Sequence, residues 1–202
     1  MRIIRCGVVR QPLAYLRHFS LCCLILLPLL AYWANDLVRP LHAQPAALPP
    51  IRISQIYGGG GNSEATLHSD FVELFNAGAE PVNLNGWSVQ YAAKEGTNWA
   101  VTSLGDVTIA GFGYLLIRQA AGDGGSDAGS ALEMPDVIDD TSMSATEGKV
   151  ALVAGTASII GLSDGAVVDF VGYGNANEAE LATAAKLSNT TAAQRASDGC
   201  TD

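Results

Sequence analysis

The chain is poor in the residue types that carry metal, redox and acid–base chemistry. It has 4 cysteines and 3 histidines in 202 residues, and after residue 43 only Cys200 and His68 remain. One cysteine cannot form an intrachain disulfide, and a zinc site built from two cysteines and two histidines is excluded by count. Catalysis that depends on a histidine base is restricted to His68.

Lysine and arginine are also scarce. The chain has 11 basic and 20 acidic residues, and the part after residue 43 has six basic and nineteen acidic residues, a formal charge of −13. Affinity for nucleic acids comes from lysine and arginine that displace counterions from the phosphates. We therefore expect no nucleic-acid partner, whereas cationic partners, including metal ions, are favoured.

Residues 1–43 have the pattern of a secretory signal peptide. Four arginines precede an apolar run over residues 19–34, and Ala43 offers a cleavage site before Gln44. The alternative is an uncleaved membrane anchor, although the run is shorter than the ~20 apolar residues that span a bilayer. In both cases we expect a secreted or cell-surface protein that contacts a membrane only through this segment, if it stays uncleaved.

Short strand patterns recur after a proline-rich spacer over residues 44–50. Segments rich in glycine, asparagine, aspartate and serine separate them. Such spacing predicts an all-β sandwich or barrel. The sequence indicates eight strands, at residues 51–57, 70–76, 87–92, 99–101, 107–109, 114–117, 149–154 and 167–173. Residues 181–187 could form one or two helical turns.

Eight blocks of the sequence form a pattern through their order and spacing: residues 53–62, 70–76, 84–91, 110–117, 148–153, 167–174, 188–195 and 199–202. Together they resemble the lamin-tail domain family in its exported bacterial form. The resemblance implies an immunoglobulin-like β-sandwich of about eight to nine strands over residues 51–202. We expect the apolar strand residues to form its core: Phe71, Val72, Leu74, Trp87, Val89, Tyr91, Leu116, Val150 and Leu152.

Two features depart from the family pattern. Relatives usually have a cysteine soon after the motif at residues 173–174, a natural partner for Cys200, and residues 175–180 contain none. Relatives also continue beyond the stretch that ends at Asp202. We therefore expect either a truncated gene product or a fragment of a longer protein, with an unpaired Cys200 that promotes association.

Two patterns that could indicate catalysis are better explained as structure. No lysine follows the glycine-rich segment 58–62, so a flexible connection is favoured over a phosphate-binding loop. His68 and Asp70 could complete a catalytic triad with Ser63 or Ser69, but the chain lacks a Gly-x-Ser-x-Gly elbow. We expect a solvated loop histidine and no catalytic residue.

Carboxylates are the remaining candidates for ligand chemistry. Asp70 and Glu73 differ in parity along one strand, so they point to different faces and do not share an ion easily. Loop carboxylates suit Ca²⁺, but the twelve-residue EF-hand frame is absent and ordinary solvated loops are favoured. The weak Ca²⁺ candidates are Asp123, Asp127, Asp136, Asp139 and Asp140. No other cofactor is expected.

Two further sets have structural and functional interpretations. Asp169 lies inside an apolar strand, where an unpaired charge would be costly, so we expect it to pair with a loop amide or with Arg118. Trp87 and Tyr91 share a face of one strand and are expected in the core, with a carbohydrate platform as the alternative. For Trp99 the sequence favours neither the core nor the carbohydrate platform.

The family resemblance implies a non-catalytic module that binds a protein or cell-envelope partner. Such modules commonly stand beside secreted hydrolases, so the main alternative is the accessory domain of a nuclease or phosphatase whose catalytic part is absent. A Ca²⁺-stabilised adhesion module is a further alternative. The expected mechanism is strand pairing at a sheet edge or contact through loops held on a rigid frame.

Overall fold

The computed structural model describes residues 50–122 and 129–197. Within these residues no helix has the length and apolar character needed to cross a membrane. The described residues contain eleven strands: β1 (Ile51–Tyr57), β2 (Ser69–Asn76), β3 (Val82–Asn83), β4 (Ser88–Ala93), β5 (Ala100–Ser103), β6 (Thr108–Ile109), β7 (Tyr114–Ala121), β8 (Val137–Ile138), β9 (Gly148–Val153), β10 (Val167–Tyr173) and β11 (Ala193–Gln194).

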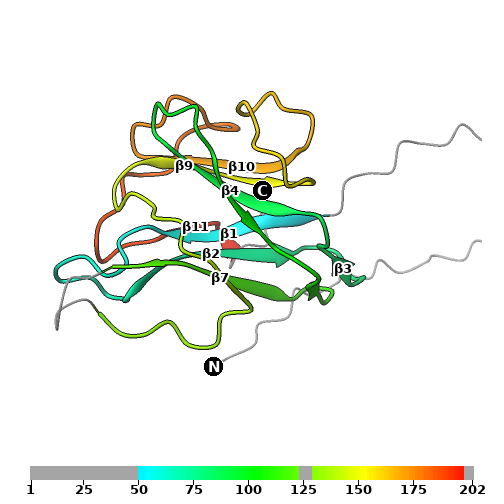
Figure 1. The fold of residues 1–202 in the computed structure, drawn as a ribbon, viewed down its shortest axis with the longest axis horizontal. Coiled ribbons are helices and arrows are strands. Elements are labelled where there is room, and N and C mark those ends of the chain that lie inside the picture. The colour runs from blue at the N-terminus through cyan, green and yellow to red at the C-terminus, as the bar shows by residue number, and fades with distance from the viewer. Residues whose placement is uncertain (1–49, 123–128, 198–202) are drawn as a thin grey trace, which may run out of the picture. The chain divides into compact units, whose positions relative to one another are not determined.

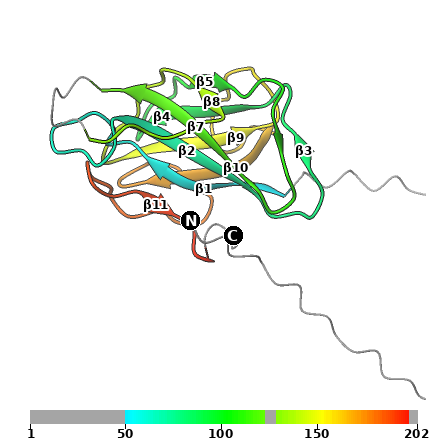
Figure 2. The same cartoon turned by 90° about the horizontal axis from the view of Figure 1, so that it is seen from below.

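Two sheets stacked face to face form a sandwich (Figure 1). Sheet A has the strand order β11-β1-β2-β7-β8, and sheet D has the order β10-β9-β4-β5. Strands β3 and β6 form a separate two-stranded ribbon. Strand β11 lies along one side of the sandwich, and β5 and β8 lie along the opposite side (Figure 2). The predicted all-β, immunoglobulin-like sandwich is confirmed.

The eight expected strands are all present, whereas three further strands were not expected. These are β3, β8 and β11, which have two residues each and are too short to show a period. The expected helical turns over residues 181–187 are wrong. Ala184 instead pairs with the end of β10, because its amide donates to the Gly172 carbonyl (2.8 Å) and its carbonyl accepts from the Gly174 amide (3.0 Å).

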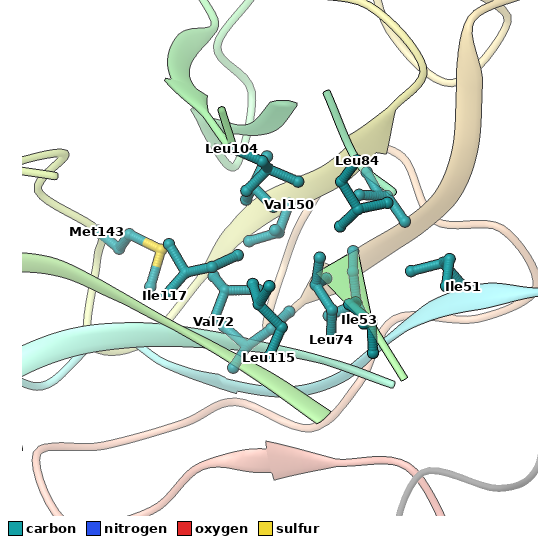
Figure 3. Packing of buried hydrophobic residues seen from close by; sticks show 14 of the residues in the cluster. Ile51, Ile53, Val72, Leu74, Leu84, Leu104, Leu115, Ile117, Met143 and Val150 are labelled. Atoms are coloured by element: carbon teal, nitrogen blue, oxygen red, sulfur yellow. The ribbon is translucent and has the colours of Figure 1, made fainter. Parts of the chain in front are cut away.

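The main core lies between the sheets and consists of the inward-facing residues of each strand (Figure 3). Val72 and Leu74 of β2 and Val150 and Leu152 of β9 are fully buried, as is Val89 of β4. Trp87 and Tyr91 are half-buried and pack against the same cluster. Their inward orientation follows from the period of two along this segment.

Two expected core residues lie on the outer face of sheet A. The expectation for Leu116 is wrong, because Leu115 and Ile117 face the core and Leu116 between them is only half-buried. Phe71 is buried but also points away from the second sheet, since its neighbour Val72 points inward. It stacks on Tyr57, with ring centroids 5.7 Å apart.

The outer face of sheet D has a second apolar cluster. Trp99 is 6% exposed and packs edge-on against Phe170 of β10 at 5.7 Å between ring centroids. Ile159 and Leu162, from the connection between β9 and β10, contact the same cluster. This packing makes Trp99 a core residue of the second cluster.

The glycine-rich segment after β1 is a packed structural element, and the expected flexible connection is wrong. Residues 58–61 are buried against backbone from other loops. A Cβ on Gly60 would lie 2.0 Å from the carbonyl carbon of Ser69. Gly61 has φ +65°, and a Cβ there would lie 2.2 Å from Cα of Gly122. Glycine is required because backbone segments approach one another this closely.

Candidate binding groove

A groove of about 210 Å³ opens on the side of the sandwich where β1 and β11 of sheet A approach β10 of sheet D. A third segment, which leaves β10 and returns towards β11, forms the rim. The lining residues are Ile53, Ser54, Gln55, Ile56, Phe170, Val171, Glu180, Leu181, Ala182, Ala184, Ala193, Gln194 and Arg195. The sides of the groove are therefore rigid strands, and the rim is a loop.

The groove exists because the outer edges of β1 and β10 are paired with other backbone over only a few residues. Strand β11 pairs with β1 only at Gln55 and Ile56. The outer edge of β10 pairs with Ala184 only near its C-terminal end, at Gly172 and Gly174. The stretch of β10 before Gly172 therefore borders the groove.

An ion pair links β10 to the residue that follows β11 on this side of the sandwich. Asp169 of β10 is 4% exposed and contacts Arg195, which follows β11, with 2.5 Å between Oδ1 and Nη2. Asp169 Oδ2 accepts from the Ile53 amide (2.6 Å), and Arg195 Nε donates to the Ile53 carbonyl (2.8 Å). The Arg195 amide also donates to the Ser54 carbonyl (2.9 Å).

The two side chains therefore take the place of a neighbouring strand at Ile53. Both backbone groups of Ile53 are satisfied by charged partners, which form stronger hydrogen bonds than neutral ones. Asp169 Oδ1 also accepts from the Phe170 amide (2.9 Å), so the buried carboxylate has three partners. Of the two partners expected for Asp169, a backbone amide is present, whereas Arg118 is not the cation that pairs with it.

The exposed part of the groove is apolar at its rim. Leu181 is 94% exposed, the largest exposure among the large apolar side chains of the described residues. Phe170 also lines the groove and is 2% exposed. Sites for small molecules usually enclose about 300–1,000 Å³, so a groove of about 210 Å³ is sized for one or two apolar side chains of a partner.

Strand addition at a sheet edge is less favoured by this geometry. The edge strands β8 and β11 have two residues each, and the edge strand β5 has four. Edge strand β10 carries a bulge between Val167 and Asp169 and an inward-pointing charge. Short edges, bulges and inward charges are the features that prevent edge-to-edge pairing. Of the two mechanisms expected from the sequence, contact through the loop and the groove fits better.

Asp70, one of the residues of the disfavoured catalytic triad, has a structural role. Asp70 is 3% exposed, and its two oxygens accept from the amides of Gly60 and Met143, each at 2.8 Å. Burial raises the pKa of the Asp70 carboxyl to about 6, although the two amide hydrogen bonds act to lower it. His68 is half-exposed, and Ser63 is exposed on a loop. Asp70 therefore ties the glycine-rich segment to the segment at Met143.

Asp70 and Glu73 lie on opposite faces of β2, as predicted. Asp70 points inward, whereas Glu73 Oε1 on the outer face accepts from Ser54 Oγ at 2.6 Å. Burial raises the pKa of Glu73, and the Ser54 hydrogen bond opposes this shift. The two carboxylates do not form a shared site.

The Ca²⁺ candidates are not gathered into a site by the described residues. Asp123 and Asp127 lie outside these residues. Asp136 Oδ2 accepts from the Leu116 amide (2.8 Å), and Asp140 is exposed. Asp139 accepts hydrogen bonds from Thr102 and Thr141. In residues 50–122 and 129–197, no group of three or more His, Cys, Asp or Glu side chains is placed to hold a metal ion.

The side of the sandwich opposite the groove is closed by hydroxyl and amide groups. Thr102 Oγ1 of β5 donates to Asp139 Oδ2 (2.5 Å) and accepts from Gln119 Nε2 of β7 (3.0 Å). Thr141 Oγ1 donates to the same Asp139 oxygen (3.0 Å). Since Thr102 and Gln119 are buried, this network joins the two sheets. Asp139 therefore has a structural role here.

Sequence reasoning missed Arg195 and the groove itself. Only six basic residues follow residue 43, and the buried Asp169 needs a cation, so Arg195 was one of few candidates. Nothing in the sequence separates it from the other five. The groove is made by segments far apart in the chain and leaves no local pattern.

Comparison with known proteins supports the fold. A family model described as Lamin Tail Domain matches residues 44–175. No curated protein matches the chain.

Proposed function

Because the chain belongs to the lamin-tail domain family, we propose that it is a non-catalytic module that recruits a protein partner outside the cell or at its surface. The family is one of immunoglobulin-like domains, and rigid sandwiches of this kind can present loops for recognition. Residues 1–43, with their basic start and apolar run, support export. The strongly acidic charge after residue 43 favours a cationic partner.

The observation that carries this proposal is the groove between β1, β10 and β11. Its sides are strands whose backbone is fixed by the Asp169–Arg195 ion pair, so the site is formed before a partner arrives. Preformed sites lose less entropy when they bind. An apolar side chain of the partner enters the groove and contacts Leu181 at its rim, in the manner of an anchor residue.

A pair of matched variants tests the proposal. Leu181→Asp places a charge at the rim of the groove, and Ile160→Asp places the same charge on the connection between β9 and β10. Both side chains are strongly exposed, at 94% and 80%, so neither substitution should cost much folding stability.

The assay is capture of cell-envelope proteins on immobilised chain, followed by measurement of the affinity for the captured protein. Losing one apolar contact of about 1.5–3 kcal/mol weakens binding roughly 10- to 150-fold. We expect this loss for Leu181→Asp and unchanged binding for Ile160→Asp. Equal binding by the two variants, or no captured protein for the wild-type chain, would contradict the proposal.

A further inference from the structure

Lys149 is a buried lysine on the outer face of sheet D. Its side chain is 2% exposed. Alternation along β9 places it on the face opposite Val150 and Leu152, beside the second apolar cluster. Its Nζ lies 5.3 Å from the centroid of the Trp99 ring. A cation in such a setting requires close polar partners.

Three oxygen atoms surround the Lys149 nitrogen. Nζ donates to the Gly96 carbonyl (2.9 Å), to Asn177 Oδ1 (2.9 Å) and to Glu178 Oε2 (3.2 Å). A primary amine from β9 thus meets a carboxamide and a carboxylate from two consecutive residues of the segment after β10. These are the groups that an acyl transfer requires: a nucleophile, an acyl carbon with a leaving group, and a base beside the nucleophile.

The backbone around the site holds these groups in place. Gly172 lies directly opposite Lys149 in the β9–β10 pair, and a Cβ there would lie 2.1 Å from the Glu178 carbonyl oxygen. The missing side chain lets the segment after β10 lie against the sheet. The backbone N–H of Asn177 donates to the backbone carbonyl of Lys94 (2.9 Å). This hydrogen bond fixes the backbone of Asn177 beside Lys149.

We propose that Lys149 and Asn177 react with each other to form an intramolecular amide bond, with Glu178 as the proton carrier. The Lys149 ammonium gives a proton to Glu178, and the free amine attacks Cγ of Asn177. A bond forms between Nζ and Cγ. Glu178 then delivers a proton to Nδ2 and takes one from Nζ, the Cγ–Nδ2 bond breaks, and ammonia leaves.

The reaction is balanced without any other reactant. The amine and the carboxamide become one secondary amide and one ammonia, and no atom is oxidised or reduced. The proton left on Glu178 departs with the ammonia as ammonium, so Glu178 returns to its carboxylate. The chain loses the positive charge of Lys149. Asn177 lies at the surface, which gives the ammonia a way out.

The setting favours this reaction in two ways. The reacting groups are already in contact, and holding reactants in place removes much of the entropic barrier to their combination. The Trp99 ring, 5.3 Å from Nζ, covers the amine side of the site, and the Lys149 side chain is only 2% exposed. Water at this position would compete with Asn177 and Glu178 for the hydrogen bonds of Nζ.

A second lysine, glutamate and asparagine set in the same chain lacks this arrangement. Lys94 Nζ lies 2.8 Å from Glu147 Oε1, and Asn175 donates through Nδ2 to Glu147 Oε2 (3.0 Å). Here the carboxylate lies between the amine and the amide, and the lysine side chain is 39% exposed. We expect no bond at this set, so it serves as an internal control.

The bond would join β9 to the segment that continues into the groove rim at Glu180 and Leu181. It closes a ring from Lys149 to Asn177 and restricts the unfolded chain. The inference does not depend on the proposed binding function, since it concerns a covalent link on another face of sheet D.

The test is the intact mass of the purified full chain under denaturing conditions. Loss of one ammonia lowers the mass by about 17 Da relative to the sequence. Trypsin should also fail to cut after Lys149, because an acylated lysine is not a substrate. Residues 119–186 would then remain one peptide, with the same deficit and with Lys149 linked to Asn177 by fragmentation.

Variants locate the chemistry. Glu178→Gln and Asn177→Ala should restore the mass expected from each sequence and cleavage after Lys149. Glu147→Gln and Asn175→Ala should keep the deficit of about 17 Da. A wild-type chain with its full mass and normal cleavage after Lys149 would overturn the proposal, as would a deficit that persists in Asn177→Ala.

Discussion

The Asp169–Arg195 ion pair allows a sharp prediction about what holds the open side of the sandwich together. Asp169→Asn keeps the shape of the side chain but removes its charge. The carboxylate is 4% exposed and accepts from Arg195, the Ile53 amide and the Phe170 amide. Removing one partner of a buried pair leaves the other charge uncompensated, which costs about 3–5 kcal/mol.

This loss is large compared with the 5–15 kcal/mol that typically stabilises a domain. It corresponds to a fall in Tm of roughly 6–20 °C for a domain of this size. The assay is urea unfolding of the full chain, followed by the fluorescence of Trp87 and Trp99. Asp140→Asn is the matched control, because Asp140 is exposed and the same change there should stay within about 0.5 kcal/mol.

The double variant Asp169→Leu with Arg195→Met separates two contributions. If the carboxylate served only to neutralise Arg195, removing both charges would restore stability. Since both side chains also satisfy the backbone of Ile53, we expect the double variant to remain about 1–3 kcal/mol less stable than wild type. Full recovery in the double variant, or equal effects of Asp169→Asn and Asp140→Asn, would refute this reasoning.

Three further predictions follow from the same structure. Gly60→Ala should destabilise the fold by about 1–3 kcal/mol or more, because its Cβ would lie 2.0 Å from backbone. Gly165→Ala, where the Cβ would meet open space, should change the free energy of unfolding little. Chemical denaturation compares the two variants. The folded pKa of Asp70 is about 6 and its ordinary value is 3.8, so the folded state binds this proton more tightly. The contribution of Asp70 to the free energy of unfolding should therefore be greatest below about pH 4 and should fall by up to roughly 3 kcal/mol as the pH rises through 6. Unfolding measured at several pH values tests this, and Asp70→Asn should remove the dependence. Thr102→Val should cost about 1–3 kcal/mol in the same assay because Asp139 and Gln119 lose a buried partner, and an unchanged midpoint would contradict this.

Regular alternation made much of the fold predictable. Val150 and Leu152 alternate in β9, and Trp87, Val89 and Tyr91 in the segment around β4, so their facing towards the second sheet follows from the period of two. The run at residues 114–117 is continuously apolar and has no alternation. The side chain that faces the core, Leu115 and not Leu116, therefore could not be predicted from the sequence.

The candidate site was far less predictable than the fold. Asp169 could be singled out because a charge stands within an apolar strand, but Arg195 is its partner only through the path of the chain after β10. The role of Gly60 depends on Ser69 and Asp70 lying against it, a contact that composition does not encode. Loop glycines therefore suggested flexibility where tertiary packing makes them rigid.

We propose that the groove between β1, β10 and β11 binds a protein partner. Site-specific photo-crosslinking tests it most directly, with the photoreactive residue at Gln194 in the groove and, as control, at Asn85 in an exposed turn. We predict a crosslinked protein of the cell envelope or its surroundings from position 194 and none from position 85. Crosslinks of equal yield from both positions, or only from position 85, would contradict the account.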